Sequence, residues 1–91
     1  MSRNKSKRHH SRLRLVSKEA RRAGMFLLCE RFRWEFLSAR TGRTVLTWFQ
    51  DSGRWTIPGG RTGEARSPFW ALHAAIAADR GRQQEAMAAT L

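Results

Sequence analysis

The stretch Arg31–Phe36, RFRWEF, alternates aromatic with charged side chains and decides the fold class. Its three aromatic residues share one parity, and two arginines and a glutamate fill the positions before and between them. Because successive side chains of a strand point to opposite faces, this period of two predicts a half-buried β-strand. Phe26 and Leu28 have the same parity as the aromatic residues, so we expect the strand to extend back towards Met25.

Two further strands are predicted after it. Thr44–Gln50, TVLTWFQ, is rich in β-branched and aromatic residues, and a glycine-containing segment, residues 38–43, separates it from the first strand. Asp51–Gly53 suits a three-residue hairpin loop, and Arg54–Ile57 forms the third strand before a Pro-Gly-Gly stop. The sequence therefore predicts a three-stranded antiparallel meander. The side chains expected on its covered face are Phe32, Trp34, Phe36, Trp55 and Ile57.

A helix at the C-terminal side completes the predicted domain. Residues 61–66 are expected to be loop, and Ser67-Pro68 places a capping serine before a proline at the first helical position. The helix should run to about Arg80, with Gly81 as its stop and residues 82–91 as a frayed helical tail. The fold class predicted is α+β, with a β-β-β-α domain over residues 25–81. The helix face expected to pack on the sheet is Phe69, Leu72, Ala75 and Ile76.

The N-terminal residues carry most of the charge. Met1–Gly24 contains all three lysines, six of the fifteen arginines and one acid, so it supplies a formal +8 of the net charge of +11. Residues 1–12 have no periodic apolar face and are expected to be a disordered basic arm. Residues 13–24 are expected to form a short helix or an extension, with Gly24 as the stop in the helical reading.

A polycation of this density repels itself unless an anionic partner lies beside it, and nucleic acids are the commonest intracellular polyanions. One helix covers only one face of the sheet, so an aromatic residue of the second strand is expected on the open face beside arginines. The parity of that strand leaves Phe49 and Trp48 both open for this position, and Trp48 is the candidate for base stacking. The alternative is that this aromatic residue packs under residues 13–24 or the C-terminal tail. The candidate nucleic-acid-binding residues are Arg3, Lys5, Lys7, Arg8, Arg12, Arg14, Lys18, Arg21, Arg22, Arg31, Arg33, Arg40, Arg43, Trp48, Arg54, Arg61 and Arg66.

Other chemistry has little basis in the sequence. His9-His10 has no Cys, Asp or Glu within several residues, so no metal site is expected, and no cofactor-binding motif is present. Cys29 is the single cysteine, which excludes an intrachain disulfide. No carboxylate pair or positioned nucleophile indicates an enzyme. Neither a signal peptide nor a membrane span is visible, so a cytoplasmic or nucleoid-associated protein is expected.

The predicted layout resembles two families of nucleic-acid-binding domains. The three strands and the helix SPFWALHAAIAA look like the plant AP2-type and integrase amino-terminal DNA-binding domains, over about half of the chain. That resemblance implies that the open face of the sheet enters the major groove. The loop over residues 58–67 is longer than the short connection of those families. With a helix over 17–23 the order looks like that of double-stranded-RNA-binding domains, although Phe69-Trp70 stands where those domains have lysines.

The function expected is a small non-enzymatic nucleic-acid-binding protein, with DNA and RNA both open as partners. Two alternatives are kept: a structural subunit of a ribonucleoprotein assembly, and a protein-binding inhibitor or adaptor that meets an acidic partner.

Overall fold

The computed structural model describes the backbone of residues 3–90 and the side chains of residues 12–83. The chain is α+β, with an open antiparallel sheet of five strands in sequential order and two helices. The elements are α1 (Arg3–Arg22), β1 (Met25–Cys29), β2 (Arg33–Ser38), β3 (Thr44–Phe49), β4 (Arg54–Thr56), β5 (Thr62–Glu64) and α2 (Pro68–Thr90). The predicted fold class and the packing of a C-terminal helix on the sheet are confirmed, but the meander has five strands in place of three.

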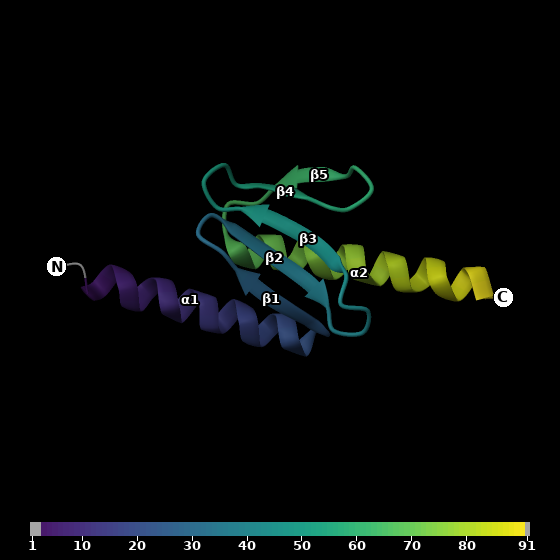
Figure 1. Ribbon diagram of the computed structural model, residues 1–91, viewed down its shortest axis with the longest axis horizontal. Helices are drawn as coiled ribbons and strands as arrows, with labels where there is room; N and C mark the ends of the chain where they lie inside the picture. The colour runs from purple at the N-terminus through teal and green to yellow at the C-terminus, as the bar shows by residue number, and fades with distance from the viewer. Residues whose placement is uncertain (1–2, 91) are drawn as a thin grey trace.

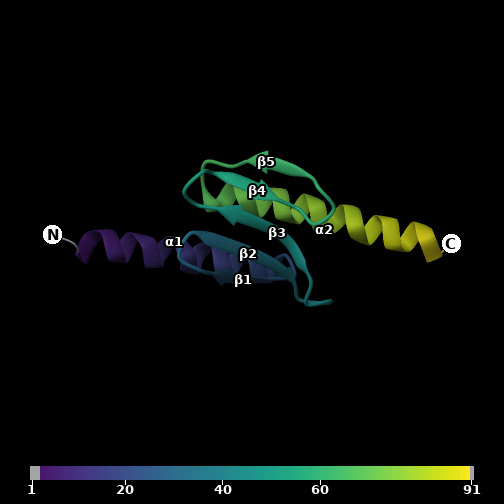
Figure 2. The same cartoon turned by 45° about the horizontal axis from the view of Figure 1, so that its top comes forward.

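Both helices lie on the same face of the sheet, and the other face is left open (Figures 1 and 2). α1 packs on β1, α2 packs on β3 and β2, and the two helices also contact each other. The N-terminal end of α1 and the C-terminal end of α2 extend past the sheet in opposite directions (Figure 1). The buried side chains of the core are Val16, Ala20, Met25, Trp34, Phe36, Val45, Leu46, Trp48, Ala65, Ala71, Leu72 and Ala75.

The first predicted strand is in fact a hairpin. The backbone N–H of Glu30 donates to the carbonyl of Arg33 at 2.8 Å, and the N–H of Arg33 donates to the carbonyl of Glu30 at 3.3 Å. Arg31 and Phe32 therefore form the turn between them. Leu28 pairs with Glu35 of β2, and its side chain points to the open face, as that of Phe26 does. The expected parity was therefore wrong for Phe26 and Leu28, and Phe32 is 58% exposed in the turn.

A bulge decides which aromatic residue of β3 is buried. Phe36 pairs with Leu46 and Leu37 pairs with Thr44, so Val45 is an extra residue on β3. Val45 and Leu46 are consequently both buried. From Leu46 onward the even positions face the helices, which buries Trp48 and leaves Phe49 on the open face.

Trp48 is fixed in the core by two contacts. Its Nε1–H donates to the carbonyl oxygen of Ala65 at 3.0 Å, and its ring meets that of Trp34 edge-on at 5.7 Å. Ala65 follows β5, so this bond ties the end of the sheet to the segment that leads into α2.

The expected loop over residues 61–66 contains a short strand, β5. Gly63 pairs with Trp55 of β4, and the ring of Trp55 lies directly over it. A Cβ at Gly63 would overlap that ring, so the close approach requires glycine. Three residues with a central glycine give no recognisable strand pattern, which is why this element was missed.

The helices are longer than predicted. α1 ends at Arg22, followed by Gly24 at φ 79°, which confirms that stop, but it starts at Arg3 and includes most of the segment expected to be disordered. Val16 and Ala20 anchor its C-terminal half, and extending an anchored helix costs much less than nucleating one. α2 begins at Pro68, with the Trp70 N–H near the Ser67 hydroxyl at 3.5 Å, as predicted. It passes through Gly81 to Thr90, and the side chains of the predicted tail beyond 83 lie outside the described residues.

Candidate nucleic-acid interface

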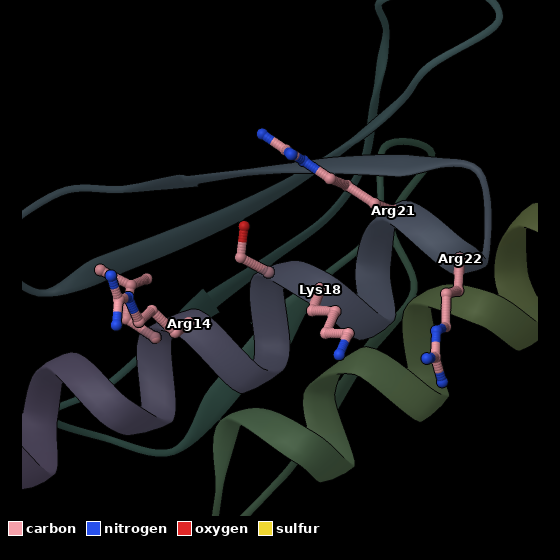
Figure 3. Close-up of a pocket in the computed structure, with 6 residues that line it drawn as sticks. Arg14, Lys18, Arg21 and Arg22 are labelled. Carbon is pink, nitrogen blue, oxygen red and sulfur yellow. The ribbon is translucent and has the colours of Figure 1, made fainter.

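A run of cationic side chains covers the face of α1 that points away from the core. Arg14, Lys18, Arg21 and Arg22 are all exposed and line a shallow groove of about 480 Å³ (Figure 3). Lys18 and Arg22 project to the same side of the helix, and Arg21 projects to the other. We call these four residues the α1 cationic face. Its floor is formed by the half-buried Leu13 and Ser17.

Acidic side chains barely neutralise this face. Among the described side chains of α1 the only acid is Glu19, which meets Arg22 at 3.4 Å in an exposed pair. Lys18 follows Arg14 by four positions, and Arg22 follows Lys18 by four, so like charges lie one helical turn apart on the same side of the helix. Each such pair destabilises a helix by about 0.2–0.5 kcal/mol.

Helix stability explains only part of the α1 cationic face. Arg21 and Arg22 lie in the last turn, where a positive charge interacts favourably with the helix dipole by about 0.3–1 kcal/mol. Arg14 and Lys18 lie further from that end and have no such compensation. These two residues therefore carry the functional argument, because the folded protein gains nothing evident from their charges.

The remaining predicted arginines are exposed but scattered. Arg12, Arg31, Arg33, Arg40, Arg43, Arg54, Arg61 and Arg66 all lie at the surface, in α1, the turns and the sheet. The side chains of Arg3, Lys5, Lys7 and Arg8 lie outside the described residues. Of the described arginines and lysines, the structure therefore gathers the α1 set around one groove.

The open face of the sheet is balanced in charge. Arg33 and Arg54 point to it, and so do Glu35 and Glu64, because Glu64 pairs with Arg54 across the strands. Arg33 is already in an ion pair with Glu30 at 2.8 Å, and Glu35 accepts a hydrogen bond from Thr44 at 2.6 Å. Charge alone gives this face no preference for phosphate.

What distinguishes the open face is its apolar surface. Phe26 and Leu28 of β1 are each 52% exposed, and Phe49 and Leu37 lie half-buried on the same face. The sequence contained the signal, because Phe26 and Leu28 alternate with Met25 and Leu27, but the missed hairpin assigned them to the wrong side.

The aromatic residue predicted to stack on bases is the wrong one. Trp48 is 3% exposed, so its ring cannot meet a ligand, and Phe49 is the aromatic residue of β3 on the open face. The alternative, in which this aromatic residue packs under residues 13–24 or the C-terminal tail, is not found, because both helices lie on the other face of the sheet. Trp70 in the first turn of α2 is 65% exposed instead. Its position could have been found from the sequence, since it falls outside the helix face formed by Leu72 and Ala75.

The described residues show no assembly typical of a metal or nucleophilic site. Within residues 12–83 no group of three or more His, Cys, Asp or Glu side chains is placed to hold a metal ion. Partial burial raises the pKa of the Cys29 thiol above its ordinary value of 9.0, which keeps the sulfur protonated at neutral pH. In the same part of the chain neither helix combines the length and apolar character that crossing a membrane requires.

Comparison with protein-family models, curated proteins and solved structures finds no match for this chain.

Proposed function

We propose that this protein is a small, non-enzymatic nucleic-acid-binding protein whose α1 cationic face binds the phosphate backbone. The observation that carries the proposal is that Arg14 and Lys18 lie exposed in mid-helix without an acidic partner among the side chains of residues 12–83. Arginine and lysine side chains bind phosphate through charge-assisted hydrogen bonds, and they do so without reading the base sequence. This role places the protein in the cytoplasm or on the nucleoid.

The packing of α1 favours a polyanion over a lipid surface. A basic helix that lies on a membrane must bury its apolar face among the lipids. In α1 that face is already used, because Val16 and Ala20 are fully buried in the protein core. Leu15 is the one large apolar side chain exposed on the described part of α1, residues 12–22. Among the described side chains of α1, the surface that remains for a partner is therefore mainly cationic.

The affinity of such a contact depends steeply on salt. Each phosphate neutralised by a cation releases counterions, so log K falls with log salt by about 0.9 per contact on B-DNA and about 0.7 on single strands. Fluorescence anisotropy with labelled duplex DNA, duplex RNA and single strands, from about 50 to 200 mM salt, measures this slope. The two contacts predict a slope of at least about 1.8 on duplex DNA and about 1.4 on single strands. Absence of binding at the lowest salt, or a flat salt dependence, would refute the proposal.

The open face of the sheet favours a second candidate, a subunit of a protein–RNA assembly. Phe26 and Leu28 expose apolar surface on a face with balanced charge, which suits a protein neighbour better than a phosphate backbone. In that case α1 would bind the nucleic acid while the open face docks on protein. The substitutions Phe26→Ser and Leu28→Ser should then abolish incorporation into a cellular particle, followed by sucrose-gradient sedimentation, while nucleic-acid affinity in vitro stays unchanged.

A further inference from the structure

A second groove lies at the β5 edge of the sheet, and α1 packs at the opposite edge, on β1. An aromatic groove of about 680 Å³ runs between β4, β5 and the start of α2. Trp55, Trp70 and His73 supply its ring surfaces, and Ala65 and Ala74 also line it. The volume lies within the range of roughly 300–1,000 Å³ typical of small-ligand sites.

The walls of this groove are held in place by the fold. The ring of Trp55 rests on Gly63, where a Cβ would overlap it. Ala65 is fixed from two sides, since its N–H donates to the Gly53 carbonyl at 2.7 Å and its own carbonyl accepts from Trp48 at 3.0 Å. A ligand would therefore meet a rigid wall, and little order would have to be gained on binding.

Trp70 is the feature that packing does not explain. It is 65% exposed, and its ring centroid lies 5.8 Å from that of His73, tilted by 47°. One side of the indole therefore has a companion ring from the next turn of the helix, while much of the rest faces water. Exposed indole surface beside a groove is suited to stacking against a flat ligand.

The charged residues of the groove indicate what such a ligand carries. Arg66 is exposed, lines the same groove as Trp70 and suits a phosphate group. A flat ring joined to a phosphate suits both the exposed indole of Trp70 and the guanidinium of Arg66. The net charge of +11 draws polyphosphates to the protein in any case.

We propose that this groove binds one unpaired base of a single-stranded nucleic acid, stacked on Trp70, with the adjoining phosphate at Arg66. The proposal rests on the proposed function, since its ligand is the nucleic acid that the α1 cationic face is proposed to bind. A base in a duplex is already stacked between its neighbours, so the groove gives a preference for single-stranded segments in DNA or RNA.

Tryptophan fluorescence tests the stacking directly. Trp34 and Trp48 are at most 3% exposed, so quenching by an added oligonucleotide reports on Trp70 and, to a smaller extent, on the half-buried Trp55. Unlabelled ribo- and deoxyribo-oligonucleotides without secondary structure are titrated into the wild type, with the matching duplexes as the second arm. Quenching by the single strands and little quenching by the duplexes is expected.

Three variants make the assignment specific. Trp70→Ala should lower the single-strand affinity by about tenfold or more, the usual loss for one stacked base, and leave duplex affinity unchanged. Trp70→Phe should recover much of the loss, because the ring is kept. Phe32→Ala removes another aromatic residue of similar exposure, 58%, and should change neither affinity.

The outcomes separate this inference from the proposed function. Unchanged single-strand affinity in Trp70→Ala, or an equal loss in Phe32→Ala, overturns the base site while duplex binding by α1 stands. Equal losses on single strands and duplexes also overturn it. If the wild type binds neither form of nucleic acid, the proposed function and the base site both fail.

Discussion

Neutralising Arg14 and Lys18 should weaken nucleic-acid binding without unfolding the protein. The variant Arg14→Gln/Lys18→Gln removes the two cations of the α1 cationic face that helix stability does not explain. The matched control is Arg80→Gln/Arg82→Gln on α2, which lowers the net charge of +11 by the same two units. Arg80 is exposed, and Arg82 donates one long hydrogen bond, 3.4 Å, to the Pro58 carbonyl.

The size of the effect follows from the counterions. If each of the two cations meets one phosphate, their loss lowers the slope of log K against log salt by about 1.8 on duplex DNA. With equal affinities extrapolated to about 1 M salt, binding weakens by about two hundredfold at about 50 mM and by about twentyfold at about 200 mM. The control should keep the wild-type slope, because a general loss of charge removes no phosphate contact.

Stability measurements show whether the variant loses affinity because it is unfolded. Arg14 and Lys18 are exposed, so the free energy of unfolding should stay within about 0.5 kcal/mol of the wild type, measured by urea unfolding. Anisotropy titrations over the salt range then give the slopes of all three proteins. Equal slopes for the α1 variant and the α2 control would refute the reasoning, since binding would then depend on overall charge and not on this face.

Three further predictions concern the fold. Trp48→Phe deletes a buried N–H donor and leaves a loop carbonyl unpaired, so urea unfolding should show a loss of about 1–3 kcal/mol, and a loss within error would contradict the packing described. Gly63→Ala should lower the free energy of unfolding by about 1–3 kcal/mol, because the added Cβ displaces Trp55. Gly81→Ala should raise it by about 0.5–1 kcal/mol, because the added Cβ meets nothing within 4 Å. A change of the same sign in both variants would contradict the account. Because the pKa of Cys29 is raised, the folded state favours the thiol over the thiolate. The stability this adds is therefore lost as pH rises above 9.0, and at a pH near 9.0 iodoacetamide should label the native protein more slowly than the urea-unfolded chain; faster labelling of the native protein would contradict it.

Elements with strong local signals could be predicted from the sequence. The alternation in Arg33–Ser38, the hairpin loop with Gly53 at φ 74° and the Ser67-Pro68 start of α2 are local features, and each is found where expected. The Arg31-Phe32 turn was missed because it contains no glycine, proline or asparagine.

The functional surface was harder to predict, since it depends on tertiary contacts. The burial of Trp48 follows from a one-residue bulge at Val45, which no local pattern announces. Gly81 should stop a helix in isolation, but a glycine inside a helix costs only about 1 kcal/mol against alanine, and the helix-forming arginines and glutamines that flank it favour continuation of the helix. The charge of residues 1–24 was evident from composition, whereas the separation of Arg14 and Lys18 from the core became visible only once Val16 was known to be buried.

Cross-linking in living cells tests most directly whether nucleic acid covers the α1 cationic face. Cells that express the wild type, the Arg14→Gln/Lys18→Gln variant or the Arg80→Gln/Arg82→Gln control are irradiated with ultraviolet light, and the protein is purified under denaturing conditions. The account predicts a nuclease-sensitive adduct with the wild type and the control, and much less with the α1 variant. An adduct absent from all three, or equally strong in all three, would contradict it.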